Sequence, residues 1–209
     1  MKRIGVFCLT LILLCNIGST PPEGEKIFFT TDVHFNKGTV KMSFHITCHW
    51  GCATGTQEYY TPCIPAETEG EFTIPDSITV PDGRVLPINW VSRGSFQSCP
   101  KLTQINIPKT VKYISDLAFQ GCTSLREITL PDSIKTIYPQ AFVGCSSLRR
   151  VRFHSASPPV SYYNDTFDET TYATATLVVP VETAEYYLSN PLTHNFRYHA
   201  EVLPIYNNE

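Results

Sequence analysis

The sequence has little charge of either sign. Its 209 residues include 16 Lys and Arg against 19 Asp and Glu, and charged residues make up only 17% of the chain. A nucleic-acid-binding protein needs a clustered excess of basic residues to neutralise phosphates, so the composition excludes that class of partner. The apolar fraction of 42% is too high for an intrinsically disordered chain. We therefore expect a folded body without a nucleic-acid partner.

Signatures of catalysis are also absent. The chain contains no Gly-x-Ser-x-Gly, no His-Glu-x-x-His, no phosphate-binding Gly-rich loop and no dinucleotide-binding fingerprint. Zinc-ligating residue types gather only at His45, Cys48, His49, Cys52 and Cys63, whose spacing matches no strong zinc signature. We therefore expect neither enzyme activity, nor a bound metal, nor a cofactor.

Long apolar runs are missing except at the beginning of the chain. Lys2 and Arg3 precede an unbroken apolar run over residues 4–14, and small and polar residues follow it. This order predicts a secretory signal peptide at 1–19. Cleavage there would release a free protein, whereas Cys15 is a candidate for the lipid-bearing first residue of a lipoprotein. Free secretion is favoured, because a lipoprotein signal normally has Gly, Ala or Ser before the Cys and this chain has Leu.

An internal repeat of 23 residues organises the middle of the chain. Residues 101–123 align without gaps on residues 124–146, with nine of 23 positions identical. Five apolar columns keep this step, among them Phe96/Phe119/Phe142 and Cys99/Cys122/Cys145. A fixed period of this length is typical of a solenoid, in which stacked units bury a shared core.

Each unit begins with a short alternating segment that predicts a β-strand and ends at a Pro. Ile128 and Leu130 alternate with polar residues, and Pro131 then stops the pairing because it has no N–H to donate. Similar apolar-Pro steps recur along the chain and predict about six coils. We expect a β-rich N-terminal cap at 20–87, the solenoid at 88–175, and a C-terminal cap with a short helix at 176–209. The cysteines of the repeat column are expected to be buried, reduced thiols.

The repeats follow the pattern IPxxVxxIxxxAFxGCxSLxxIxLPxSIxxIxxxAFxGCxSL. This pattern resembles the BspA-like leucine-rich-repeat family of bacterial surface proteins. The resemblance covers residues 88–153 closely, and the C-terminal segment from Ala175 looks like the closing unit of that family. It implies a leucine-rich-repeat solenoid with short helical or irregular convex segments. It also implies secretion or display at the outer surface of a Gram-negative anaerobe, in adhesion or host contact.

The outward positions of the predicted strands supply the candidate ligand face. Arg126 in one coil and Arg149, Arg150 and Arg152 in the next form a local basic patch. Guanidinium groups bind carboxylate or sulfate by paired hydrogen bonds, so this patch is a candidate site for a protein or glycan partner. The alternative is a solvated strand face whose charges discourage aggregation.

Two further kinds of site are predicted outside the strand face. For an exported chain, one disulfide among Cys48, Cys52 and Cys63 is the simplest arrangement. Ser77 and Ser133 each follow an Asp and precede an Ile, and this pattern resembles the O-glycosylation sites of some exported bacterial proteins.

The sequence therefore predicts an exported, non-catalytic binding module whose partner is a protein or a glycan. It leaves open a second role as a structural component of a cell-envelope assembly with no soluble ligand. A lipid anchor at Cys15 would be its only link to a membrane.

Overall fold

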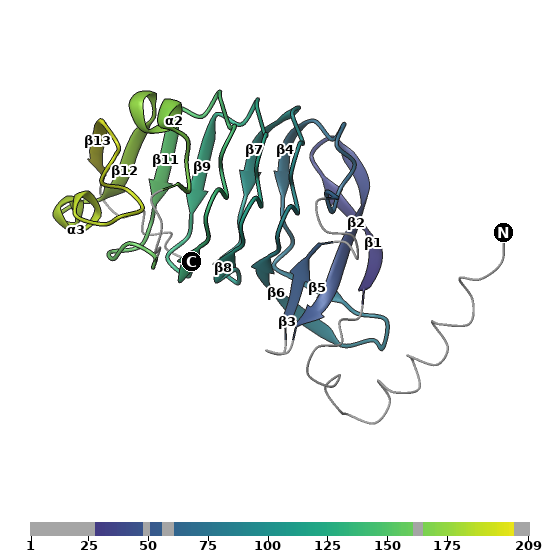
Figure 1. The fold of residues 1–209 in the computed structure, drawn as a ribbon. Coiled ribbons are helices and arrows are strands. Elements are labelled where there is room, and N and C mark those ends of the chain that lie inside the picture. The colour runs from purple at the N-terminus through teal and green to yellow at the C-terminus, as the bar shows by residue number, and fades with distance from the viewer. Residues whose placement is uncertain (1–27, 48–50, 56–60, 161–164, 203–209) are drawn as a thin grey trace.

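The computed structural model describes residues 28–47, 51–55, 61–160 and 165–202 (Figure 1). The predicted signal peptide 1–19, with Cys15, lies outside these residues, and so does Cys48. Among the helices in the described ranges, none is long and apolar enough to cross a membrane.

Six parallel strands, one from each coil, form the sheet that we call the repeat sheet (Figure 1). Hydrogen-bonded neighbours in this sheet are also neighbours along the chain, as a solenoid requires. The predicted solenoid is therefore confirmed. In chain order the strands are β4 (Gly70–Thr73), β7 (Leu102–Asn106), β9 (Glu127–Leu130), β11 (Arg150–Phe153), β12 (Thr176–Pro180) and β13 (Tyr198–Val202).

A second sheet forms another side of the coils and continues into the N-terminal part of the chain. Its order is β1-β2-β3-β6-β8-β10, and β5 pairs with β6 outside this path. The pairs β1–β2 and β2–β3 are antiparallel, whereas β3–β6, β6–β8 and β8–β10 are parallel. The strands are β1 (Phe28–Phe35), β2 (Gly38–Thr47), β3 (Gly51–Thr54), β5 (Ser77–Thr79), β6 (Val85–Val91), β8 (Tyr113–Ile114) and β10 (Thr136–Ile137).

These pairings place the ends of the solenoid differently from the expected boundaries. The repeat sheet begins at β4, inside the range 20–87 expected for the N-terminal cap. It ends at β13, inside the range 176–209 expected for the C-terminal cap. Both expected caps thus contribute strands to the repeat sheet, which extends beyond 88–175 on each side.

A ladder of stacked phenylalanines runs through the core. The ring centroids of Phe96, Phe119, Phe142 and Phe167 are separated successively by 5.2, 5.0 and 5.2 Å, with planes within 11° of parallel. The ladder rings are fully or almost fully buried. Phe167 comes two residues late in the repeat but still occupies the column.

Buried thiols form a parallel column. Cys99, Cys122 and Cys145 are free and fully buried, as the sequence predicts. The thiols of Cys122 and Cys145 each donate to the backbone carbonyl of the ladder phenylalanine one coil earlier, at 3.1 and 3.2 Å. Burial raises the pKa of Cys99 and of Cys145 to about 12, so these groups remain protonated thiols at neutral pH.

The cysteines before the repeats are not joined to each other. Cys52 and Cys63 are both free and buried, so the expected disulfide does not form between these two residues. Their surroundings differ. Cys63 lies close to Cys99 and extends the thiol column, whereas the charged neighbours of Cys52 are Asp82 and Arg84.

Two short helices cover the C-terminal coils. The first, α2 (Glu169–Thr174), begins at Asp168, whose carboxylate accepts a hydrogen bond from the Thr171 N–H at 2.7 Å. The second, α3 (Ala184–Leu188), lies where the sequence predicts a short helix ending before Pro191. The Tyr187 hydroxyl of α3 donates to the Ser155 carbonyl at 2.8 Å and ties the helix to the preceding coil.

Candidate functional site

The outward face of the repeat sheet consists of two rows of side chains in register. Inward residues of the same strands, such as Ile105, Ile128 and Val151, are buried, which fixes the direction of the alternating outward residues. One row is Glu71, Gln104, Glu127, Arg150, Thr176 and Tyr198, and the other is Thr73, Asn106, Thr129, Arg152, Val178 and Ala200.

The N-terminal half of this face is a polar network. The Asn106 amide donates to a Glu71 carboxylate oxygen at 2.7 Å and to the Thr73 hydroxyl at 3.0 Å. Gln104 donates to the Glu71 carboxylate at 3.3 Å and to the Asn106 side-chain carbonyl at 3.1 Å. Because these groups already bond to one another, this half offers few free partners to a ligand.

The two central strands, β9 and β11, are basic, and all four predicted arginines lie on β11 or at the residue before one of these strands. Glu127 accepts from Arg150 at 3.0 Å and lies 3.5 Å from the Arg152 guanidinium, so one carboxylate serves two cations. These ion pairs are half-exposed and contribute little to stability, about 0–1 kcal/mol each. They hold the two guanidinium groups in place and leave a net positive charge.

Arg126 and Arg149 are the residues directly before β9 and β11. They are neighbours across two coils, because the Arg149 N–H donates to the Arg126 carbonyl at 2.9 Å. The Arg149 guanidinium donates to the carbonyls of Ser146 and Leu148, at 3.0 and 2.9 Å. Within the described ranges, the Arg126 guanidinium has neither an ion pair nor a hydrogen bond.

A surface pocket of about 400 Å³ connects these groups, and we call it the arginine pocket. Its walls hold three guanidinium groups, one carboxylate and one hydroxyl, so the local charge is positive. The residues are Arg126, Glu127, Ser147, Arg149 and Arg150. Such a donor set suits a ligand with a carboxylate or sulfate group, which accepts paired hydrogen bonds from guanidinium.

The neighbouring histidine is influenced by the same positive charge. Partial burial, followed by the Arg152 cation, lowers the pKa of His154, so the ring is held in its neutral form. The positive charge of the central strands therefore does not come from His154.

Comparison with known families decides what the repeats are. Residues 89–188 match the model of the BspA type leucine rich repeat region in six copies. The repeats belong to the BspA-type leucine-rich-repeat family. No curated protein matches the chain.

Several solved structures of bacterial proteins are similar to this chain. A leucine rich cell surface protein from Faecalibacterium prausnitzii is 20% identical with a TM-score of 0.48, and the match covers 78% of this chain and 38% of that protein's chain. A leucine-rich repeat protein from Bacteroides capillosus is 21% identical with a TM-score of 0.39, and the match covers 58% of this chain and 97% of that protein's chain. The pneumococcal vaccine antigen PcpA is 18% identical with a TM-score of 0.37, and the match covers 71% of this chain and 40% of that protein's chain.

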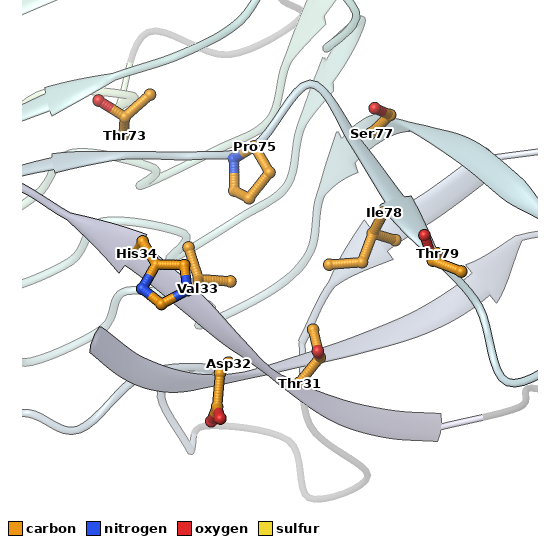
Figure 2. A pocket seen from close by; sticks show the side chains of 9 residues that line it. All are labelled: Thr31, Asp32, Val33, His34, Thr73, Pro75, Ser77, Ile78 and Thr79. Atoms are coloured by element: carbon orange, nitrogen blue, oxygen red, sulfur yellow. The ribbon is translucent and has the colours of Figure 1, made fainter.

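The two predicted glycosylation sites lie in unlike environments, Ser77 before the BspA-type repeats and Ser133 within them. Ser77 lines a groove of about 440 Å³ between β1 and β5, with Asp32 and His34 on the opposite wall (Figure 2). Its hydroxyl donates to the Asp76 carboxylate at 2.9 Å. Ser133 is half-buried, and its hydroxyl donates to the Val111 carbonyl at 2.8 Å. Of the two hydroxyls, that of Ser77 is the more accessible to a modifying enzyme.

Two residues of the arginine pocket, Glu127 and Ser147, were not among the predicted site residues. The BspA-type repeat contains a signal for the first of them, because Glu127 and Arg150 are separated by one period of 23 residues. The same step joins Arg126 to Arg149. Ser147 carries the same kind of signal, because it follows Ser124 by one period of 23 residues.

Proposed function

We propose that this chain is an exported, non-catalytic binding module that holds a partner protein through acidic groups seated in the arginine pocket. The observation that carries the proposal is the excess of three guanidinium groups over one carboxylate at the two central strands of the repeat sheet. The leucine-rich relative from Faecalibacterium prausnitzii is described as a cell surface protein, which supports display at a cell surface.

The repeat sheet suits binding because its side chains are already in position. Parallel strands in register hold Arg126 and Arg149 in adjacent coils, and the Glu127 carboxylate orients Arg150. A site that is ordered before the ligand arrives loses less conformational entropy on binding. Arginine is well suited to this task, because its planar group bonds a carboxylate through two parallel hydrogen bonds.

A structural role within a cell-envelope assembly is the second candidate. Its support is the end of the repeat sheet, where β13 pairs with β12 alone among the described strands and Tyr198 is 52% exposed. An unpaired strand edge is a template for pairing with another chain. This role needs no ligand in the arginine pocket, so the two candidates respond differently to arginine substitutions. Secretion through 1–19 and anchoring at Cys15 belong to either proposal.

The binding proposal is tested with a fluorescently labelled octaglutamate peptide as the probe. Fluorescence anisotropy measures its affinity for the wild-type chain and for the double variant Arg126→Ala/Arg149→Ala. Charge-assisted hydrogen bonds are worth about 1.5–3 kcal/mol each, so we expect the double variant to bind at least about tenfold more weakly. We also expect wild-type affinity to fall as the salt concentration rises.

The matched control is Lys41→Ala/Arg84→Ala, which removes the same charge from exposed positions outside the pocket. Equal affinities for the two double variants would reject the arginine pocket as the binding site. Concentration-dependent sedimentation of the wild-type chain that is unchanged in both variants would instead favour the structural role.

A further inference from the structure

A second surface with the character of a binding site lies on the outer face of the second sheet. Trp90, Tyr113 and Thr136 are partners in the register of β6, β8 and β10. The residue after each of them is buried, so these three side chains point outward. The buried residues are Val91, Ile114 and Ile137.

Three aromatic rings gather on this face. The Trp90 ring lies 4.4 Å from that of Tyr113 and 6.3 Å from that of Tyr138, with interplanar angles of 29° and 25°. The indole N–H donates to the Ser115 hydroxyl at 2.6 Å, which satisfies the only polar atom of the tryptophan side chain. Tyr138 is 38% exposed, and the other two rings are half-buried. The result is a nearly parallel group of rings held rigidly at the surface.

Two lysines flank the aromatic group on one side. Lys112 and Lys135 precede Tyr113 and Thr136, and the Lys135 N–H donates to the Lys112 carbonyl at 2.8 Å, so the two occupy adjacent coils. Both are exposed, and over the described part of the chain neither ammonium group forms an ion pair. Adjacent coils are about 4.8 Å apart, so both ammonium groups can reach one anion placed between them.

Hydrogen-bonding side chains flank the aromatic group on the other side. A groove of about 440 Å³ runs from Tyr138 to Gln140 and to the ion pair between Arg93 and Asp116, whose charged atoms are 2.7 Å apart. These groups offer donors and acceptors at one edge of the rings. The lysines offer only donors at the other edge.

We propose that this face binds a short anionic oligosaccharide. The apolar C–H face of a pyranose ring packs against exposed aromatic carbon, as at Tyr138 and the neighbouring Trp90. Carboxylate or sulfate groups of the sugar lie between Lys112 and Lys135, where both ammonium groups reach them. Sugar hydroxyls bond to Gln140 and Asp116 in the groove. The site is separate from the arginine pocket and does not depend on the function proposed for it.

Other classes of ligand fit this face less well. A single-stranded nucleic acid also uses aromatic and basic side chains, but it needs a basic channel that follows many phosphates. Here two free lysines adjoin a carboxylate, in a chain with a formal charge of −3. Protein partners are commonly held by large apolar anchors, whereas the rings of this face already pack against one another.

Isothermal titration of the full chain with defined oligosaccharides tests the proposal. The probes are a galacturonate hexamer and a heparin hexasaccharide, with neutral maltohexaose and a hexathymidylate as comparisons. We expect one or both anionic sugars to bind more tightly than maltohexaose and hexathymidylate. Preference for the galacturonate hexamer would identify carboxylate as the recognised group, and preference for the heparin fragment would identify sulfate.

Two variants locate the site. Tyr138→Ala is expected to weaken binding of the preferred sugar about tenfold. Lys112→Gln/Lys135→Gln is expected to abolish the preference for the anionic over the neutral sugar, and it retains the fold because both side chains are exposed. The matched controls are Tyr186→Ala, an exposed tyrosine of α3, and Lys37→Gln/Lys41→Gln at the other end of the molecule.

Circular dichroism of each variant verifies its fold before titration. No measurable affinity of the wild-type chain for any sugar would overturn the proposal. So would hexathymidylate binding as tight as that of the sugars, or lysine variants that match their control.

Discussion

At the residue scale, three successive coils share two turn positions with left-handed backbone. One position holds Gly94, Leu117 and Gln140, and the other holds Ser98, Gly121 and Gly144, with φ between 55° and 77°. Residues other than glycine pay roughly 1–2 kcal/mol for this conformation. These turns therefore cost free energy where the residue is not glycine. The stacking of the coils compensates for this cost.

The two repeat glycines are predicted to respond differently to the same substitution. A Cβ atom at Gly144 would lie 3.3 Å from the Gly121 backbone nitrogen, whereas a Cβ at Gly121 meets nothing closer than 3.7 Å. We therefore expect Gly144→Ala to lower the free energy of unfolding by more than Gly121→Ala, which itself costs about 1 kcal/mol. Urea denaturation measures both. Equal losses would mean that backbone strain alone governs these positions.

At the scale of elements, the phenylalanine ladder is the main contact between successive coils. Phe119 stacks on Phe96 and Phe142 at once, so it belongs to two interfaces. At the C-terminal end, Phe167 packs against Tyr172 and Phe196 instead of another ladder ring. The helix α2 and the segment before β13 thus close the core that the repeats leave open.

We predict that Phe119→Ala lowers the free energy of unfolding by about 3–5 kcal/mol, the usual cost of removing a fully buried phenylalanine. Thermal and urea denaturation, each followed by circular dichroism, provide the measurement. Phe119→Leu is the control, with a smaller expected loss because it leaves a smaller cavity. A loss below about 1 kcal/mol for Phe119→Ala would contradict the ladder.

Prediction from sequence succeeds for elements that recur and fails where the pattern stops. The columns of Phe119 and Cys122 were predictable, because Phe119 stacks on its equivalent in the next coil and Cys122 lies close to Cys145. The pairing of β1, β2 and β3 was not, since no repeat relates them. Placing Arg150 on the outward face was also possible, but its ion pair with Glu127 depends on rotamers that a period does not specify.

At the scale of the whole molecule, the cysteines connect stability to pH. In the described ranges five free thiols are buried: Cys52, Cys63, Cys99, Cys122 and Cys145. Burial raises the pKa of each above the value of 9.0 that an exposed thiol has. The unfolded chain therefore releases these protons at lower pH than the folded chain does. Raising the pH therefore lowers the free energy of unfolding, because alkali favours the state that binds fewer protons, which is the unfolded one.

We predict that the free energy of unfolding is constant up to about pH 8 and falls as the pH rises above 9. Each thiol adds a limiting slope of about 1.4 kcal/mol per pH unit. Urea denaturation between pH 7 and pH 10 measures the effect. Cys122→Ala/Cys145→Ala should flatten the dependence, although its stability at neutral pH is lower. An unchanged slope in that variant would show that other groups cause the alkaline loss.

The stacking of six strands along one direction also determines how the molecule carries a load. Each coil bonds only to the coils on either side, so tension between the two ends passes through every interface in series. The interface with the lowest rupture force therefore sets the strength of the whole. Tension applied to the two ends would therefore separate the array first at that interface, and the extended chain that is released would lengthen the molecule and dissipate the force.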